Sequence, residues 1–181
     1  MPIQINGNGT ITGISVGGLP DGIVDTDTLA NGAATQAKRT YATGETVQTV
    51  QSNTVSNNSP NGQTWTTIIP VTFTPKFSDS VLIFRASIRF QESTQGNSEF
   101  RFRVRQDDST NVGGSSGGTY GHYYVGVSNV ISFFNASFSD TVSGGTSQRT
   151  YNFQMYEEST GALYIGPNNY ASCCSVEEIK A

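Results

Sequence analysis

The sequence has few charged residues, and this scarcity limits the partners that the chain can bind. Lysine, arginine, aspartate and glutamate make up 13% of its 181 residues, about half the share in an average globular protein. The formal net charge is -4 and the pI is near 4.8, so there is no basic footprint for duplex nucleic acid or an acidic membrane surface. We therefore expect neither as a partner.

Long apolar runs are missing as well. No stretch approaches the roughly 20 apolar residues that cross a bilayer, which excludes a spanning helix. The residues after Met1 have neither the basic start nor the apolar core of a signal peptide. We therefore expect the chain to stay in the cytoplasm of its producer, free or bound to a particle.

Residues that hold metals are scarce. The chain has one histidine and two cysteines, too few for a zinc site unless subunits share one, for example through His122 on a threefold axis. Cys173 and Cys174 are adjacent, and neighbours in a strand point to opposite faces, which disfavours a bond between them. We expect two free thiols, no metal and no cofactor.

Glycine, serine, threonine and asparagine are abundant instead, and they favour turns and strands over helix. After Thr64 apolar residues alternate with polar ones, and turn clusters separate the runs. The inward sets are Leu82, Phe84, Ala86, Ile88 and Phe90, then Phe100, Phe102 and Val104, then Tyr151, Phe153 and Met155. Further strands are predicted at 65–74, 119–127, 130–138, 161–166 and 172–179. The pattern predicts an all-β fold over residues 41–181, an antiparallel jelly-roll-like β-sandwich of eight or nine strands.

Residues 1–40 differ, because isolated isoleucine, valine and leucine residues stand between glycine, aspartate and threonine. Such a segment cannot build a core, so its apolar side chains need a partner surface or copies of themselves. We expect an extended attachment segment with at most a short helix, capped by Asp25 or Asp27. The attachment residues would be Ile11, Ile14, Val16, Leu19, Ile23, Val24 and Leu29.

One predicted strand is apolar on both faces. Phe134 shares a face with Val130 and Phe138, while Ile131 and Phe133 lie on the opposite face. A sandwich strand needs one buried face, so the second set, together with Val81 and Ile83, predicts a trimer interface. The alternative is local cover by a loop.

A glycine- and serine-rich stretch from Gly113 to Gly118 precedes Tyr120, His122, Tyr123 and Tyr124. Aromatic rings stack on sugars while their polar groups form hydrogen bonds, and loops on a rigid scaffold often carry function. These residues are the candidate receptor-binding site for a host polysaccharide. The alternative is that the tyrosines fill the sandwich.

Charged and aromatic residues elsewhere also have two interpretations. Arg101, Arg103 and Arg105 point outward from one strand, where they can grip an anionic sugar or pair with glutamates such as Glu157 and Glu92. Trp65 is predicted to be a core or interface residue rather than a sugar platform.

Three acidic pairs invite comparison with a glycosidase, namely Asp107-Asp108, Glu157-Glu158 and Glu177-Glu178. Adjacent strand residues point to opposite sides, and Asp107-Asp108 fits a hairpin turn. We expect solvated turns and edges, and no enzyme.

Two parts of the chain resemble proteins of phage particles. The run GTITGISVGGLPDGIVDTDTLANGA, within residues 5–35, is similar to an N-terminal segment of tail-fibre-like proteins of phages, especially those of cyanobacteria and marine bacteria. The runs TVQTVQ, WTTIIPVTFTPKFSDSVLIF, RTYNFQMYEESTGALYIG and SCCSVEEI resemble the companion domain of such proteins. The matches span most of the chain.

This resemblance implies a homotrimeric fibre or spike in the virion. Its N-terminal segment would bind other virion proteins, and its C-terminal jelly roll would resemble the trimeric heads of tumour-necrosis-factor-like proteins. The implied function is adsorption to a host-surface glycan. A capsid decoration, collar or baseplate element without a receptor is the alternative, and the family has no catalytic residues to transfer.

Overall fold

The computed structural model describes most of the chain, in stretches that form two units. The described residues are 4–5, 11–12, 40–54, 63–92, 98–113, 121–125, 131–141, 145–158, 163–166 and 171–181. Contacts group the chain into Met1–Thr40 and Tyr41–Ala181. In these stretches no helix is long and apolar enough to cross a membrane.

The first unit contains an antiparallel pair of short strands, β1 (Gln4–Ile5) and β2 (Ile11–Thr12). Of the predicted attachment residues, Ile11 lies in β2, opposite Ile5. The other attachment residues, and the short helix predicted after Asp25, lie outside the described residues.

Strands and their connections make up the described residues of the second unit. The strands are β3 (Thr46–Thr54), β4 (Thr66–Phe73), β5 (Val81–Glu92), β6 (Ser98–Gln106), β7 (Thr110–Asn111), β8 (Gly121–Val125), β9 (Ile131–Thr141), β10 (Arg149–Glu157), β11 (Leu163–Ile165) and β12 (Ser172–Ile179). Every pairing between them is antiparallel.

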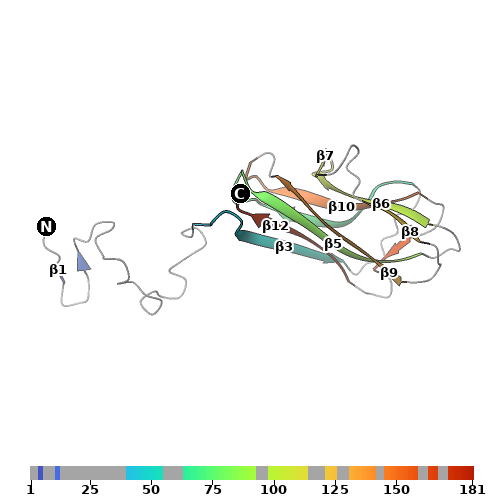
Figure 1. The fold of residues 1–181 in the computed structure, drawn as a ribbon, viewed down its shortest axis with the longest axis horizontal. Helices are drawn as coiled ribbons and strands as arrows, with labels where there is room; N and C mark the ends of the chain where they lie inside the picture. The colour runs from blue at the N-terminus through green and yellow to red at the C-terminus, as the bar shows by residue number, and fades with distance from the viewer. Residues whose placement is uncertain are drawn as a thin grey trace. The chain divides into compact units, whose positions relative to one another are not determined.

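These strands form two sheets (Figure 1). The first, called the β5 sheet, has the order β3-β12-β5-β9, and β11 continues the β12 side of β5. The second, called the β6 sheet, has the order β4-β10-β6-β8, with β7 on the same side of β6 as β8. The chain crosses repeatedly from one sheet to the other, and these two orders are those of a jelly roll. The predicted fold class is confirmed.

The core lies between the sheets and follows the predicted alternation. The inward residues of β5, β6 and β10 are all buried, as are Phe73 of β4 and Phe134 of β9. Aromatic rings meet across the sheets, with centroids 4.8 Å apart for Phe90 and Phe100 and 4.9 Å for Phe102 and Phe134. Burial of one such side chain stabilises the fold by about 1.5–3 kcal/mol, so the aromatic core is the main source of stability.

The two ends of the sandwich unit lie together. β3 pairs with β12 over almost its whole length, and Thr46 stands opposite Ile179. Beyond the strands, the Gly44 amide donates to the Lys180 carbonyl at 2.7 Å and the Lys180 amide donates to the Glu45 carbonyl at 2.9 Å. Figure 1 shows the C-terminus beside the start of β3. The first and last strands of this unit therefore lie side by side at one edge of the β5 sheet.

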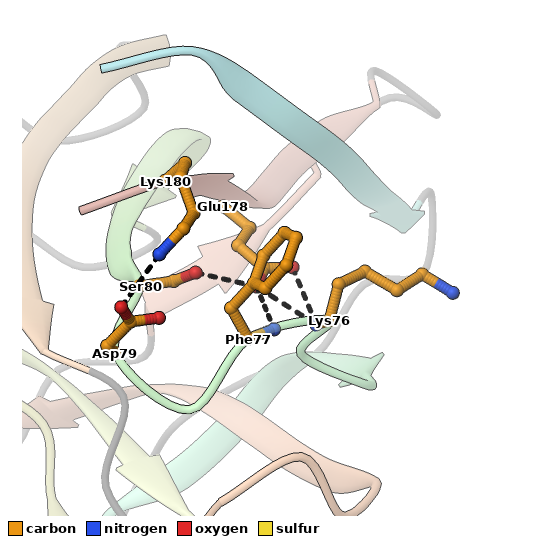
Figure 2. A network of polar contacts seen from close by, with 6 residues as sticks. All are labelled: Lys76, Phe77, Asp79, Ser80, Glu178 and Lys180. Carbon is orange, nitrogen blue, oxygen red and sulfur yellow. Dashed lines mark hydrogen bonds and ion pairs between the residues drawn. The ribbon is translucent and has the colours of Figure 1, made fainter. Parts of the chain in front are cut away.

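One glutamate contradicts the expectation that the acidic pairs are solvated. Glu178 of β12 is fully buried, and Figure 2 shows its carboxylate meeting the turn between β4 and β5. The carboxylate accepts from the amides of Lys76 and Phe77 at 2.9 Å, from the Ser80 hydroxyl at 2.8 Å and from Gln48 Nε2 at 2.7 Å. These donors replace the water that a solvated carboxylate would bind.

Glu157 of β10 is also buried. The expectation of a solvated edge was therefore wrong for one member of each of two acidic pairs. Their partners in sequence, Glu158 and Glu177, are only partly buried.

Candidate functional site

The outer surface of the β5 sheet, called the β5 face, is hollowed at its centre. The hollow measures about 490 Å³ and lies over the middle of β5, β9 and β12. Its lining residues are Arg85, Ala86, Ser87, Asn135, Ala136, Ser137, Cys173 and Ser175. Most of these side chains are small, so the hollow lies between the larger side chains around them.

Apolar residues lie at both ends of the β5 face. At one end Phe133 is 51% exposed and Tyr164 is 38% exposed, and the strand register places Tyr164 and Ile131 on either side of Gln91. At the other end Val81 and Ile83 are half-buried. The predicted interface residues therefore share one face but form two groups, with the hollow between them. Their role as an interface stays a prediction.

Charged groups on the β5 face are held by their neighbours. The Arg89 guanidinium lies 4.9 Å from the centre of the Phe133 ring. Arg85 forms an ion pair with Glu177, which also accepts from the Thr46 hydroxyl at 2.9 Å. The hydrogen bond from Arg85 lowers the pKa of Glu177 below its ordinary value.

The two cysteines are free thiols, as predicted. Cys173 is half-buried on the floor of the hollow, and Cys174 is buried in the core on the opposite side of β12. Burial raises the pKa of both thiols, with the larger rise at Cys174. A raised pKa leaves less of the thiolate, which is the reactive form.

The outer surface of the β6 sheet, called the β6 face, has a different character. The predicted row of outward arginines is confirmed: Arg101, Arg103 and Arg105 stand opposite Tyr156, Gln154 and Asn152 of β10. Arg101 forms an ion pair with Glu158. Of the two glutamates given as examples of partners, Glu157 is buried, and the side chain of Glu92 lies outside the described residues.

Trp65, just before β4, packs on this face. The Arg103 guanidinium lies 4.0 Å from the centre of the indole. The Tyr156 ring contacts the indole as well, with centroids 5.4 Å apart and the planes tilted by 45°. The indole is half-buried between these neighbours, which agrees with a packing role rather than an open sugar platform.

Two buried amides connect the β6 face to a hairpin turn. Asn152 and Gln154 are 8% and 6% exposed, although they occupy outward positions of β10. Asn152 Nδ2 donates to Asp108 Oδ1 at 2.9 Å, and Gln154 Nε2 donates to the same oxygen at 3.1 Å. Arg103 Nε donates to Gln154 Oε1 at 2.7 Å. The network thus joins Arg103, two amides and one carboxylate.

The turn that carries Asp108 has an uncommon backbone. Asp107 and Asp108 have φ angles of 47° and 56°, and the Ser109 amide donates to the Gln106 carbonyl at 3.0 Å. Two successive residues with positive φ are typical of a two-residue hairpin turn, in which aspartate is accepted. The predicted turn is confirmed, and it positions Asp108 over β10.

Arg105 is the third arginine of the row on the β6 face. Its Nη2 donates to the Ser109 carbonyl at 2.6 Å, while its Nε is buried without an acceptor in the described part of the chain. Burial lowers the pKa of Arg103, and the positive charge of Arg105 lowers it further, against the opposing effect of Asp108. The two guanidinium groups therefore lie close enough for the charge of Arg105 to affect Arg103.

The predicted receptor residues fall at the edge of the same sheet. His122, Tyr123 and Tyr124 lie in β8, opposite Arg101, Phe100 and Glu99 of β6. Tyr120 lies outside the described residues. The β8 backbone therefore adjoins the strand that carries the arginines, and the role of these residues in binding stays a prediction.

The acidic pairs have structural contacts. Asp107 accepts from the Thr150 amide at 2.8 Å, Asp108 from two amides of β10, and Glu177 from Arg85. No cluster of three or more histidine, cysteine or acidic residues fit to hold a metal occurs among the residues that the structure describes.

Sequence reasoning did not single out Asn152 and Gln154, and it placed Asp108 in a hairpin turn without its contacts to them. The available signal was an Asn-x-Gln pair on the outward side of a strand that is otherwise apolar. Amides at such positions usually face water, so their burial follows from Arg103 and the turn that cover them.

Comparisons with known proteins give no family. No protein-family model matches the chain, and no curated protein matches it. Solved structures similar to it include the disulfide-linked pili of Bacillus endospore appendages, with 13% identity over 79% of this chain and 97% of that chain and a TM-score of 0.37.

Two carbohydrate-binding modules are also similar. One is the CBM36-1 domain of a multidomain xylanase from the hindgut metagenome of Trinervitermes trinervoides, with 14% identity, 71% and 96% coverage and a TM-score of 0.32. The other is a CBM36 module in complex with calcium and xylotriose, with 12% identity, 71% and 98% coverage and a TM-score of 0.29. At such identities and TM-scores, these likenesses do not indicate what this chain binds.

Proposed function

We propose that the chain is a non-enzymatic structural subunit of a phage particle, a fibre or spike that forms a homotrimer and adsorbs to a host-surface glycan. The difference between the two outer faces of the sandwich carries this proposal. The β5 face offers apolar side chains around a hollow, which suits association with copies of the chain. The β6 face offers arginines, amides and aromatic rings, which suit a polar sugar.

The phage context is supported by the resemblance of residues 5–35 to the N-terminal segment of tail-fibre-like proteins. The separate grouping of Met1–Thr40 fits a segment that binds other virion proteins while the jelly roll does another task. The location would then be the virion, after assembly in the host cytoplasm.

Association is tested by light scattering of the purified full chain and of Phe133→Ser. We expect the mass of a trimer for the wild type and a shift toward monomer for the variant, because Phe133 is half-exposed on the β5 face. Lys76→Ser is the control, since it removes a long exposed side chain from the turn between β4 and β5, outside the strands of that face. A wild-type monomer at micromolar concentration would contradict the trimer.

Adsorption is tested with a glycan array probed by the purified chain, and the place on the virion by electron microscopy with gold-labelled antibody. Binding to surface polysaccharides of the host and labelling at the tail support a receptor-binding fibre. Labelling of the capsid, collar or baseplate, together with an array free of binding, would favour the second candidate. That candidate is an architectural component without a receptor.

A further inference from the structure

Arginines and carboxylates lie close together on the β6 face. Arg101 is paired with Glu158, and Asp108 is the carboxylate whose charge acts on Arg103. Asp107, the next carboxylate along the turn, accepts from the Thr150 amide instead. Neither Arg103 nor Arg105 forms an ion pair with a carboxylate in the described part of the chain.

The Asp108 carboxylate is already occupied by amides. Its Oδ1 accepts from both Asn152 and Gln154, and these two side chains are buried beneath it. Gln154 in turn holds Arg103 through Oε1 and reaches Thr67 Oγ1 at 3.1 Å through Nε2. The arginine side chains thus rest on a fixed polar floor, which limits how far they move when a ligand binds.

One donor of Arg105 has no acceptor among the residues that the structure describes. This donor is the buried Nε, whereas Nη2 is held by the Ser109 carbonyl. A buried donor that stays unsatisfied destabilises a protein, and such a donor in a native structure calls for an explanation. An acceptor supplied by a ligand would satisfy it.

We infer that Arg103 and Arg105 bind an oxyanion, the carboxylate or sulfate group of an acidic polysaccharide. Guanidinium groups present parallel N–H donors that match the oxygens of such groups, and these charge-assisted hydrogen bonds are stronger than neutral ones. The inference rests on the proposed adsorption to a glycan and names the chemical class of that glycan.

Trp65 provides the readout. It is the single tryptophan of the chain, and the Arg103 guanidinium lies 4.0 Å from its ring. An anion bound to Arg103 changes the charge next to the indole and therefore its fluorescence. We expect a saturable change on titration of the full chain with sodium glucuronate or sodium sulfate, and none with glucose, at constant ionic strength. The anion that binds more tightly identifies the ligand group as a carboxylate or a sulfate.

Three variants separate specific binding from general charge effects. Arg105→Gln should weaken anion binding by roughly tenfold or more, because hydrogen bonds to charged groups are strong. Arg105→Lys should restore it only in part, since an ammonium group keeps the charge but lacks the fork. The matched control Arg85→Gln, on the other sheet, should bind as the wild type does. Melting temperatures check that each variant folds.

An absent or unsaturable fluorescence change in the wild type would overturn the inference, as would equal binding by Arg105→Gln. The glycan array then separates this failure from failure of the proposed function. Unchanged binding of neutral host glycans by Arg105→Gln leaves adsorption standing without the oxyanion site. An array without binding to any glycan rejects both.

Discussion

Glu178 shows how a buried carboxylate can hold a turn to the sheet. Its oxygens accept from Lys76, Phe77, Ser80 and Gln48, and these donors would lose their acceptor in Glu178→Ala. A buried donor left without an acceptor costs about 1–3 kcal/mol. We expect a loss of that size in the free energy of unfolding, measured by urea denaturation.

Glu177 provides the control for Glu178, because it is next in sequence but faces the β5 surface. Its ion pair with Arg85 is partly exposed, and such pairs contribute about 0.2–1 kcal/mol. Glu177→Ala should therefore lose far less stability. Equal losses in the two alanine variants would show that the Glu178 contacts add little.

The Glu177-Arg85 pair should also make stability depend on pH. Since the hydrogen bond from Arg85 lowers the pKa of Glu177 in the folded state, its contribution is present above the ordinary pKa of glutamate and is lost as the pH falls through the lowered value. We expect Arg85→Gln to be less stable than the wild type at pH 6, with a smaller difference at pH 3. Urea midpoints at both values measure this, and a difference independent of pH would count against the pair.

At the level of elements, the turn between β6 and β7 tests whether backbone conformation or side-chain contacts contribute more to stability. Asp108 has a φ of 56°, which glycine adopts more easily than aspartate. Asp108→Gly nevertheless removes the acceptor of Asn152 and Gln154, two buried amides. Unsatisfied buried donors cost about 1–3 kcal/mol.

We therefore expect Asp108→Gly to lower the melting temperature despite its better backbone. Asp107→Gly, at the neighbouring positive-φ position, is the control without contacts to these amides. A rise in melting temperature for Asp108→Gly would mean that backbone strain outweighs the network.

The strands were predictable because their burial follows period-two alternation. β5 and β6 have long runs in which apolar and polar residues alternate, so their inward faces are visible in the sequence. For β10, the sequence predicted the inward residues but not the burial of the outward ones. Its outward amides are buried by Trp65, Arg103 and the Asp108 turn, which come from other parts of the chain.

Glu178 could not be predicted for a similar reason. Its donors lie about a hundred residues earlier in the sequence. A local pattern at the end of β12 contains no information on them, and an acidic pair near a strand end is usually solvated. The same holds for the hollow, which arises where three strands bring small residues together.

For the whole molecule, the division into two units predicts the effect of a deletion. The apolar core lies within Tyr41–Ala181. Removing residues 1–38 should therefore leave a cooperative thermal transition close to that of the full chain, while incorporation into particles is lost. Calorimetry and particle purification measure the two effects. Loss of the cooperative transition would show that the first unit shares the core.

Cys173 offers a second test of assembly. Its thiol lies on the floor of the hollow in the β5 face, so a trimer formed through that face would shield it. We expect a thiol reagent to modify Cys173 slowly in the wild type and faster in Phe133→Ser. Cys174 should react only after the protein has unfolded. Equal rates at Cys173 in both proteins would place the interface elsewhere.

The pairing of β3 with β12 also decides how the sandwich responds to pulling. If the proposed function is correct, a particle that adheres through the jelly roll transmits force through Thr40 and Tyr41 into the start of β3. For a pull along β3, the hydrogen bonds from β3 to β12 run across the direction of force. The ladder is then loaded in shear, so its bonds must fail together rather than open one after another. Under such a load, the first strand of the jelly roll is its mechanical anchor.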